Sequence, residues 1–270
     1  VGILFFVYST SPLPAQDFTY PPDMGDAEFR VYKTVQDIEL RLWIYTPNDH
    51  KSSDARPAIV FFFGGGWQAG SPMQFKPHAE YLASRGVVAI SVEYRVRSRH
   101  GVSVSACVAD AQSAIQWVRN QAKDFGIDPE RIIASGGSAG GHLAASTATL
   151  ELPSSHFIER KVSSEPNALI LFNPAVILAP VAGLHPKHLQ PLENYRDRFD
   201  VTMDSLSPFH HLTSNVGPTL IFHGMSDELV PFATVELFTQ KMRELGNRCE
   251  LIGYEDARHG FFNYGRHNNI

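Results

Sequence analysis

The sequence predicts an α/β fold, with a mainly parallel sheet of about eight strands and helices on both faces. Short runs that are almost entirely apolar recur along the 270-residue chain, as expected of strands covered on both faces. Segments with apolar residues at helical spacing separate these runs, which is typical of parallel strands joined by crossover helices. The chain is 43% hydrophobic and long enough for one such domain, expected over residues 29–270.

The elements follow from the pattern in order. Segments 29–35 and 38–46 alternate apolar and polar residues, which favours an antiparallel pair with one solvated face. Buried strands are expected at 56–63, 87–94, from 131 to the glycines that follow, and at 168–172, 219–223 and 249–254. Helices are expected at 77–85, 104–125, 143–150 and 232–245, several of them closed by a following glycine.

The first fifteen residues are interpreted as the remnant of a secretory signal peptide. An apolar run, Val1–Tyr8, precedes small residues and a cleavage point near Ala15. The run is too short to span a bilayer, so no membrane insertion of the mature chain is expected. Residues 16–28 are interpreted as a lead-in linker. A secreted or periplasmic protein is therefore expected.

Composition argues against several other classes of function. The net charge is −5 and no long run of lysine and arginine occurs, so no nucleic-acid partner is expected. Cys107 and Cys249 fit buried apolar positions better than a disulfide. No zinc spacing is present, and the histidines His185, His188, His210 and His211 have no carboxylate at regular spacing. We expect no metal and no cofactor.

The strand that begins near Arg131 ends in a turn rich in small residues. Gly136-Gly-Ser138-Ala-Gly140 fits G-x-S-x-G, the nucleophile elbow, and a run of helix formers follows it. The pattern needs glycine because the serine backbone is strained, and side chains at Gly136 and Gly140 would collide with the neighbouring strand and helix. The alternative is a phosphate-binding turn, but this stretch has neither of the glycine spacings that are usual for one. Ser138 is the candidate nucleophile.

A serine hydroxyl needs a base, and the base needs an orienting carboxylate. Asp227 follows the strand 219–223, and His259 follows the strand 249–254. The carboxyl ends of parallel strands share one edge of the sheet, so these side chains are expected to meet Ser138 there. The order Ser, Asp, His is that of the α/β hydrolases.

Rival residues are less suited to these roles. Glu228 adjoins Asp227, but the position after strand and turn favours Asp227. Asp256 is too close in sequence to His259 to orient it, His142 fits a packing position on the helix, and His223 is expected to shape a turn.

The strand 56–63 runs into Gly64-Gly-Gly-Trp67, a second glycine-rich turn. Glycines let backbone amides converge on a developing oxyanion, with the amide of Ala139 as the expected partner donor. A dinucleotide loop would need a glycine spacing that this stretch misses by one residue.

Residues 177–217 interrupt the alternation of strands and helices. Prolines recur there, including Pro180, Pro186, Pro191 and Pro208, too often for a regular element. We interpret the segment as an excursion over the active-site side of the sheet. The excursion and Trp67 are candidate substrate contacts, and packing roles are equally open.

With these motifs in place, the chain resembles the α/β-hydrolase superfamily over residues 30–262. It is most similar to the hormone-sensitive-lipase-like esterases and to bacterial relatives that act as acetylxylan and feruloyl esterases. The resemblance implies that Gly65, Gly66 and Ala139 are the oxyanion donors. It also implies a closing helix beyond Ile270, and a histidine at the position that Phe63 occupies here.

The expected function is therefore a serine carboxylesterase that works through an acyl-enzyme. A small ester is the expected substrate, with acetyl groups on a polysaccharide preferred. A peptidase of the prolyl-oligopeptidase kind is one alternative. A non-catalytic binding module on the same fold is the other, although such modules typically lose a member of the triad.

Overall fold

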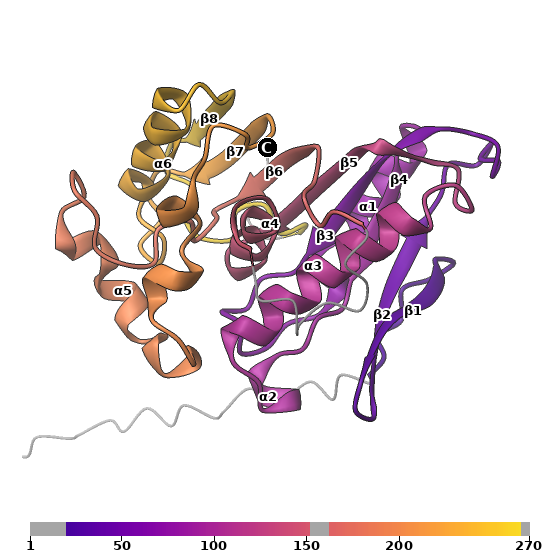
Figure 1. Cartoon of the computed structure of the whole chain (residues 1–270), viewed down its shortest axis with the longest axis horizontal. Helices are drawn as coiled ribbons and strands as arrows, with labels where there is room; N and C mark the ends of the chain where they lie inside the picture. The colour runs from indigo at the N-terminus through magenta and orange to yellow at the C-terminus, as the bar shows by residue number, and fades with distance from the viewer. Residues whose placement is uncertain (1–19, 152–161, 266–270) are drawn as a thin grey trace, which may run out of the picture.

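The computed structural model describes residues 20–151 and 162–265, which form an eight-stranded sheet with helices on both sides (Figure 1). The strand order is β1-β2-β4-β3-β5-β6-β7-β8. Pairs β1–β2 and β2–β4 are antiparallel, and every other pair is parallel. The bounds are β1 Glu28–Val35, β2 Ile38–Tyr45, β3 Arg56–Phe62, β4 Val88–Val92, β5 Ile127–Gly137, β6 Ala168–Phe172, β7 Thr219–Gly224 and β8 Cys249–Tyr254. The mainly parallel sheet confirms the predicted fold class.

The side chains of β3 show why the sheet needs covering on both faces. Val60 and Phe62 belong to a core cluster that also contains residues of α3 (Val104–Asn120), α4 (Ala139–Thr149) and α6 (Phe232–Glu244). Ile59 and Phe61 belong to a second cluster, with residues of α1 (Lys76–Ser84). Alternate residues of a strand point to opposite faces, so an all-apolar strand requires a helix layer on each side.

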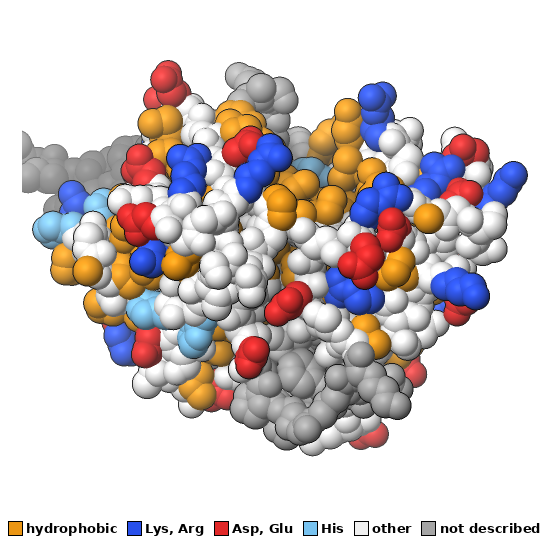
Figure 2. Space-filling model, turned by 45° about the horizontal axis from the view of Figure 1, so that its top comes forward, with side chains coloured by type: hydrophobic (Ala, Val, Ile, Leu, Met, Phe, Trp, Pro, Cys, Tyr) orange, Lys and Arg blue, Asp and Glu red, His pale blue; other side chains and the backbone are white. Residues whose placement is uncertain are grey.

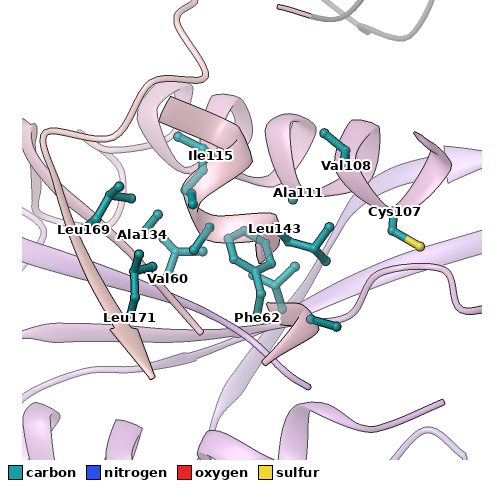
Figure 3. Packing of buried hydrophobic residues seen from close by; sticks show 14 of the residues in the cluster. Val60, Phe62, Cys107, Val108, Ala111, Ile115, Ala134, Leu143, Leu169 and Leu171 are labelled. Atoms are coloured by element: carbon teal, nitrogen blue, oxygen red, sulfur yellow. The ribbon is translucent and has the colours of Figure 1, made fainter. Parts of the chain in front are cut away.

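Figure 3 shows the first of these clusters from close by. Side chains of α3, among them Val108 and Ile115, lie over Val60 and Phe62 of β3 and Leu169 of β6. All five of these side chains are at most 1% exposed. The apolar residues whose spacing predicted a helix from Val104 therefore form the helix face that packs against the sheet.

The carboxyl ends of the central strands lie at one edge of the sheet. Phe62 at the end of β3 is in register with Gly136 of β5, and Gly137 with Phe172 at the end of β6. Gly224 at the end of β7 is in register with Tyr254 at the end of β8. The turns that follow these strands therefore meet, as expected for this class of sheet.

Several elements differ from the sequence prediction, among them β5, which begins at Ile127 and not at Arg131, and α4, which begins at Ala139 and not at Leu143. The helix expected over 104–125 ends at Asn120, and residues up to Gly126, whose φ is +57°, form turns that lead into β5. A short helix, α2 (Arg97–His100), was not predicted. The excursion 177–217 contains one short helix, α5 (Gln190–Glu193), and several 3₁₀ turns. In α2 the amides of Arg97 and Ser98 donate to the Trp67 and Gln68 carbonyls, and α5 has a proline in its first turn. Hydrophobic periodicity detects neither feature.

The predicted signal peptide, residues 1–15, lies outside the described residues. The described part of the lead-in packs against the domain, because Tyr45 Oη donates to the Met24 carbonyl at 3.0 Å and Met24 is 3% exposed. Cys107 and Cys249 are both buried and unpaired, as predicted. Among the described residues, none of the helices has the length and apolar character to cross a membrane.

Candidate active site

Ser138 occupies the turn between β5 and α4. Its backbone is strained, with φ 55° and ψ −119°, a region that non-glycine residues rarely adopt. A Cβ on Gly140 would lie 2.0 Å from the Phe62 carbonyl oxygen, and one on Gly136 would lie 2.4 Å from the Gly140 carbonyl oxygen. The collision with strand and helix that the sequence predicted is therefore present at both glycines.

The three predicted catalytic side chains form a connected chain of hydrogen bonds. Ser138 Oγ lies 2.8 Å from His259 Nε2, and His259 Nδ1 lies 2.7 Å from Asp227 Oδ2. Because Asp227 accepts from Nδ1, the neutral imidazole presents its Nε2 lone pair to the serine hydroxyl. The structure thus brings together three residues separated by up to 121 positions in the sequence.

The Asp227 carboxylate is buried and its hydrogen-bonding capacity is well used. Oδ1 accepts from the backbone amides of Leu229 and Val230, each at 2.9 Å. Burial raises the pKa of Asp227, but the hydrogen bond and charge of His259 and the Val230 amide outweigh burial and hold it below the ordinary value. Asp227 is therefore ionised throughout the neutral range.

Sequence reasoning missed Asn173. Its side-chain amide donates to Asp227 Oδ2, the same oxygen that accepts from His259. Asn173 is fully buried, with a φ of +42°, and directly follows β6. The rule that found Asp227 and His259, a polar residue beyond a strand's carboxyl end, could have found Asn173 too.

The rival residues lie elsewhere, as expected. His223 Nε2 donates to the Val230 carbonyl at 2.7 Å within the turn that holds Asp227, and burial lowers its pKa to about 4. His142 is fully buried beneath the elbow. Glu228 is exposed, and Asp256 lies in a turn with a φ of +57°. In the described part of the chain, none of the four side chains hydrogen-bonds to Ser138 Oγ, and His142 meets Ser138 only through its backbone amide, which donates to the Ser138 carbonyl at 3.0 Å.

The Gly64–Trp67 turn has backbone conformations that favour glycine. Gly65 and Gly66 have φ values of +128° and +59°. A Cβ on Gly65 would lie 2.1 Å from the Ala69 carbonyl oxygen, so only glycine fits. The Gly65 carbonyl accepts from the amides of Gln68 and Ala69, so this oxygen is engaged within the turn. Ala139 adds its amide at the positive end of α4, consistent with the predicted oxyanion donors.

Phe63 stabilises this loop in place of the histidine that the resemblance implied. Its ring stacks on Tyr94 at a centroid distance of 4.1 Å, and Tyr94 Oη donates to the Phe63 carbonyl at 2.7 Å. Gln74 adds a second brace, since its Oε1 accepts from the Gly64 amide at 2.6 Å and its Nε2 donates to Asn263 at 2.8 Å. The oxyanion loop is thus linked to the segment that follows His259.

A cavity of about 440 Å³ opens onto these groups. Its wall includes Ser138, His259 and the glycine loop, together with Tyr195 and Arg198 from the excursion. Part of the 177–217 segment therefore does border the candidate site. Trp67 also borders the cavity, but it is 2% exposed and its indole N–H donates to His142 Nδ1 at 3.1 Å. Contact of Trp67 with substrate stays a prediction.

The surface carries no large basic patch on the face shown in Figure 2, where side chains of both charge signs are interspersed. Within residues 20–151 and 162–265, no group of three histidine, cysteine or acidic side chains converges in a way that could hold a metal ion.

Comparison with known proteins places this geometry in a family. The BD-FAE model matches residues 42–178, about half of the chain, and the prolyl oligopeptidase family model matches residues 171–269. A probable isoprenylcysteine α-carbonyl methylesterase of Arabidopsis thaliana is 29% identical over 81% of this chain and 48% of its own length. Esterase LipC of Mycobacterium tuberculosis is 28% identical over 76% of this chain and 53% of its own. The chain spans about half the length of these curated relatives.

Solved structures give a fuller match. Native esterase 2 of the planctomycete Thermogutta terrifontis superposes with a TM-score of 0.86 and 52% identity, covering 94% of this chain and 90% of that one. The same esterase has been solved with propionate bound, with butyrate bound and phosphorylated by paraoxon. The match extends over nearly all of both chains. The chain belongs to the BD-FAE family, among the carboxylesterase-type α/β hydrolases.

Proposed function

We propose that this protein is a serine ester hydrolase that works through an acyl-enzyme. The observation that carries the proposal is the pair of hydrogen bonds linking Ser138 Oγ, His259 and Asp227, at 2.8 and 2.7 Å. A serine so placed, beside two glycine amides and a helix N-terminus, has the parts needed for acyl transfer. The esterase relatives support the same reaction.

In acylation, Ser138 Oγ attacks the ester carbonyl carbon while His259 Nε2 takes the hydroxyl proton. The carbonyl oxygen becomes an oxyanion, which the amides of Gly65, Gly66 and Ala139 stabilise. His259 then gives its proton to the leaving alcohol as the carbon–oxygen bond breaks. Asp227 stays ionised and stabilises the imidazolium.

Deacylation repeats these steps with water in place of the serine hydroxyl. His259 takes a proton from water, whose oxygen attacks the acyl carbon. Collapse of the second oxyanion releases the carboxylic acid and returns the proton to Ser138. The cavity is open to solvent beside His259, which is 19% exposed in its side chain, so water can reach this position.

Ser138→Ala tests the reaction directly. Wild-type protein should hydrolyse 4-nitrophenyl acetate, and the variant should lose about 10⁴-fold or more in kcat. Paraoxon should label the wild type once per chain, and peptide mass mapping should locate the label at Ser138. Hydrolysis that persists at the wild-type rate in Ser138→Ala would remove the proposed nucleophile. A wild type without hydrolysis would favour the binding-module alternative.

A short acyl group is the finer part of the proposal. Propionate and butyrate bind the Thermogutta esterase, and the present cavity of about 440 Å³ is bordered by Leu192, Tyr195 and Phe262. With a 4-nitrophenyl ester series, kcat/KM should be highest from acetyl to butyryl and fall for octanoyl and longer groups. A rate that rises steadily with chain length contradicts this part.

We also propose acetylated polysaccharide as the natural substrate and a secreted or periplasmic location. The resemblance to acetylxylan and feruloyl esterases supports the first, and the apolar run followed by small residues near Ala15 supports the second. Acetate release from acetylated xylan, compared with 4-nitrophenyl acetate, tests the substrate. Fractionation of the source cells tests the location.

A peptidase of the prolyl oligopeptidase kind is the second candidate, because that family model matches residues 171–269. The segment contains Asp227 and His259 but not Ser138 or the oxyanion loop. Proline 4-nitroanilide substrates separate the two activities. The peptidase would be favoured if kcat/KM were higher for an anilide than for the 4-nitrophenyl ester of the same acyl group.

A further inference from the structure

Arg198 lies in the wall of the active-site cavity, on the excursion. Its guanidinium stacks over the Tyr195 ring at 4.3 Å and donates through Nη1 to the Gly66 carbonyl. A Cβ on Gly66 would lie 2.6 Å from the same nitrogen, so the guanidinium rests directly on the oxyanion loop. Stacking and the hydrogen bond together fix the position of this cation beside the predicted oxyanion donors.

The charge of Arg198 is not paired within the described part of the chain. Two charged residues just before it differ in this respect, since Asp197 pairs with Arg97 at 2.8 Å and Arg196 pairs with Glu193 at 2.9 Å. An arginine offers five N–H groups. Among the described residues, one N–H of Arg198 has a hydrogen-bond acceptor, the Gly66 carbonyl. One edge of the guanidinium therefore stays available to donate two parallel hydrogen bonds to a planar anion such as a carboxylate.

The rest of the cavity wall does not neutralise this cation. The described residues lining it include no aspartate or glutamate, and Arg198 is the one permanently charged side chain among them. A cleft lined by one sign of charge raises the local concentration of oppositely charged substrate. An anionic substrate would gain here, and a cationic one would be repelled.

We propose that Arg198 is a specificity-determining residue that selects esters whose alcohol part carries a carboxylate. The inference rests on the proposed esterase function. The charge is assigned to the alcohol because the proposed acyl groups are short and uncharged. An acetylated acidic sugar has this chemistry, with a carboxylate a few bonds from the ester oxygen. In the acylation step the carboxylate binds Arg198 while Ser138 attacks the neighbouring acetyl group.

Three aryl acetates that differ in charge test the proposal. They are 4-acetoxybenzoate, neutral 4-methylphenyl acetate and the cationic 4-acetoxyphenyl-trimethylammonium ion. Values of kcat/KM are measured for wild type, Arg198→Gln and Arg198→Lys, with Arg196→Gln as the matched control. Arg196 is a nearby exposed arginine that does not border the cavity. Each variant's ratios to the neutral ester are compared with wild type, so differences in intrinsic reactivity cancel.

Arg198→Gln should lower the ratio of kcat/KM for the anionic ester to that for the neutral ester about tenfold. It should raise the corresponding ratio for the cationic ester. Arg198→Lys should retain part of the anionic preference, and Arg196→Gln should retain all of it. Added salt should weaken the wild-type preference, because screening acts on the charge–charge attraction. An equal fall for all three esters in Arg198→Gln would mean that Arg198 only holds the loop, and overturns the proposal. Unchanged ratios overturn it too. A wild type inactive on the neutral ester instead contradicts the esterase function itself.

Discussion

The side-chain amide of Asn173 donates to Oδ2 of Asp227, the carboxylate oxygen that also accepts from Nδ1 of His259. Two donors on one oxygen fix the carboxylate in the plane that the imidazole needs. The Asn173 amide hydrogen-bonds to Asp227, whereas Ser138 Oγ bonds to His259, so Asn173 acts by positioning. It follows β6, the strand between those that supply Ser138 and Asp227, so the sheet itself sets this arrangement.

Replacing Asn173 should impair catalysis through Asp227. Asn173→Ala removes one charge-assisted hydrogen bond, worth about 1.5–3 kcal/mol, so kcat should fall roughly 10- to 100-fold. The pKa of Asp227 should rise in the variant, because a donor that favours the ionised carboxylate is lost. Asn173→Gly is the matched control for backbone strain, because glycine tolerates the φ of +42°. If the glycine variant regains full activity, strain and not the amide explains the loss.

Gln74 should matter to kcat more than to KM. It connects the Gly64 amide to Asn263, and so fixes the oxyanion loop relative to the segment after His259. Gln74→Ala should lower kcat about tenfold, since donors that drift from the oxyanion stabilise the transition state less. The adjacent exposed residue gives the control variant Met73→Ala, which should behave as wild type. A change confined to KM would contradict the proposed bracing role.

His142 should make the fold sensitive to acid. It accepts from Trp67 at Nδ1 and lies 2.7 Å from the Leu206 carbonyl at Nε2, an arrangement that requires the neutral ring. Burial lowers its pKa to about 4, against about 6.5 in an unfolded chain. Between these values the unfolded chain binds a proton that the folded chain does not. The free energy of unfolding should therefore fall as pH falls from 6.5 to 4.

The expected slope from His142 is about 1.4 kcal/mol per pH unit over that range. His223, whose pKa is also lowered to about 4, adds to it. Urea unfolding at several pH values measures the slope, and His142→Gln should reduce it. The glutamine can still donate to Leu206, so folding should survive. An unaltered slope in that variant would show that His142 is already protonated in the folded protein.

Gly140→Ala should destabilise the protein although it lies in a helix, where alanine is normally the better residue by about 1 kcal/mol. The added Cβ would lie 2.0 Å from the Phe62 carbonyl oxygen, a backbone atom that cannot move away. A loss of more than about 3 kcal/mol is expected. Gly101→Ala is the control, because Gly101 has a φ of +64° but no neighbour within 4 Å. It should cost only the 1–2 kcal/mol of left-handed backbone.

The triad could be predicted because each member follows a strand that the sequence marks clearly. Apolar runs end immediately before the turns of Ser138, Asp227 and His259, and parallel strands bring their carboxyl ends to one edge. The requirement for glycine at positions 136 and 140 could be predicted for a similar reason, since the steric clash of a Cβ there follows from the geometry of a local turn. These are properties of short stretches and of one general rule of sheet topology.

The supporting contacts could not be predicted in the same way. The hydrogen bond of Gln74 to Asn263 spans 189 positions, and Arg198 reaches Gly66 across 132. Neither pair is marked by a periodic pattern or a motif in the sequence, because glutamine, asparagine and arginine are equally common on a solvent-exposed surface.

The sequence by itself determined the order of the strands and of the long helices, and the candidate nucleophile with its two candidate partners. These follow from apolar periodicity and from glycine spacing, which act over a few residues. The tertiary structure alone decided how Phe63, Tyr94 and Gln74 hold the oxyanion loop, and that an arginine from the excursion faces the same cavity. Those features depend on which surfaces meet when the sheet twists and the excursion folds back, and no local preference of the chain fixes that.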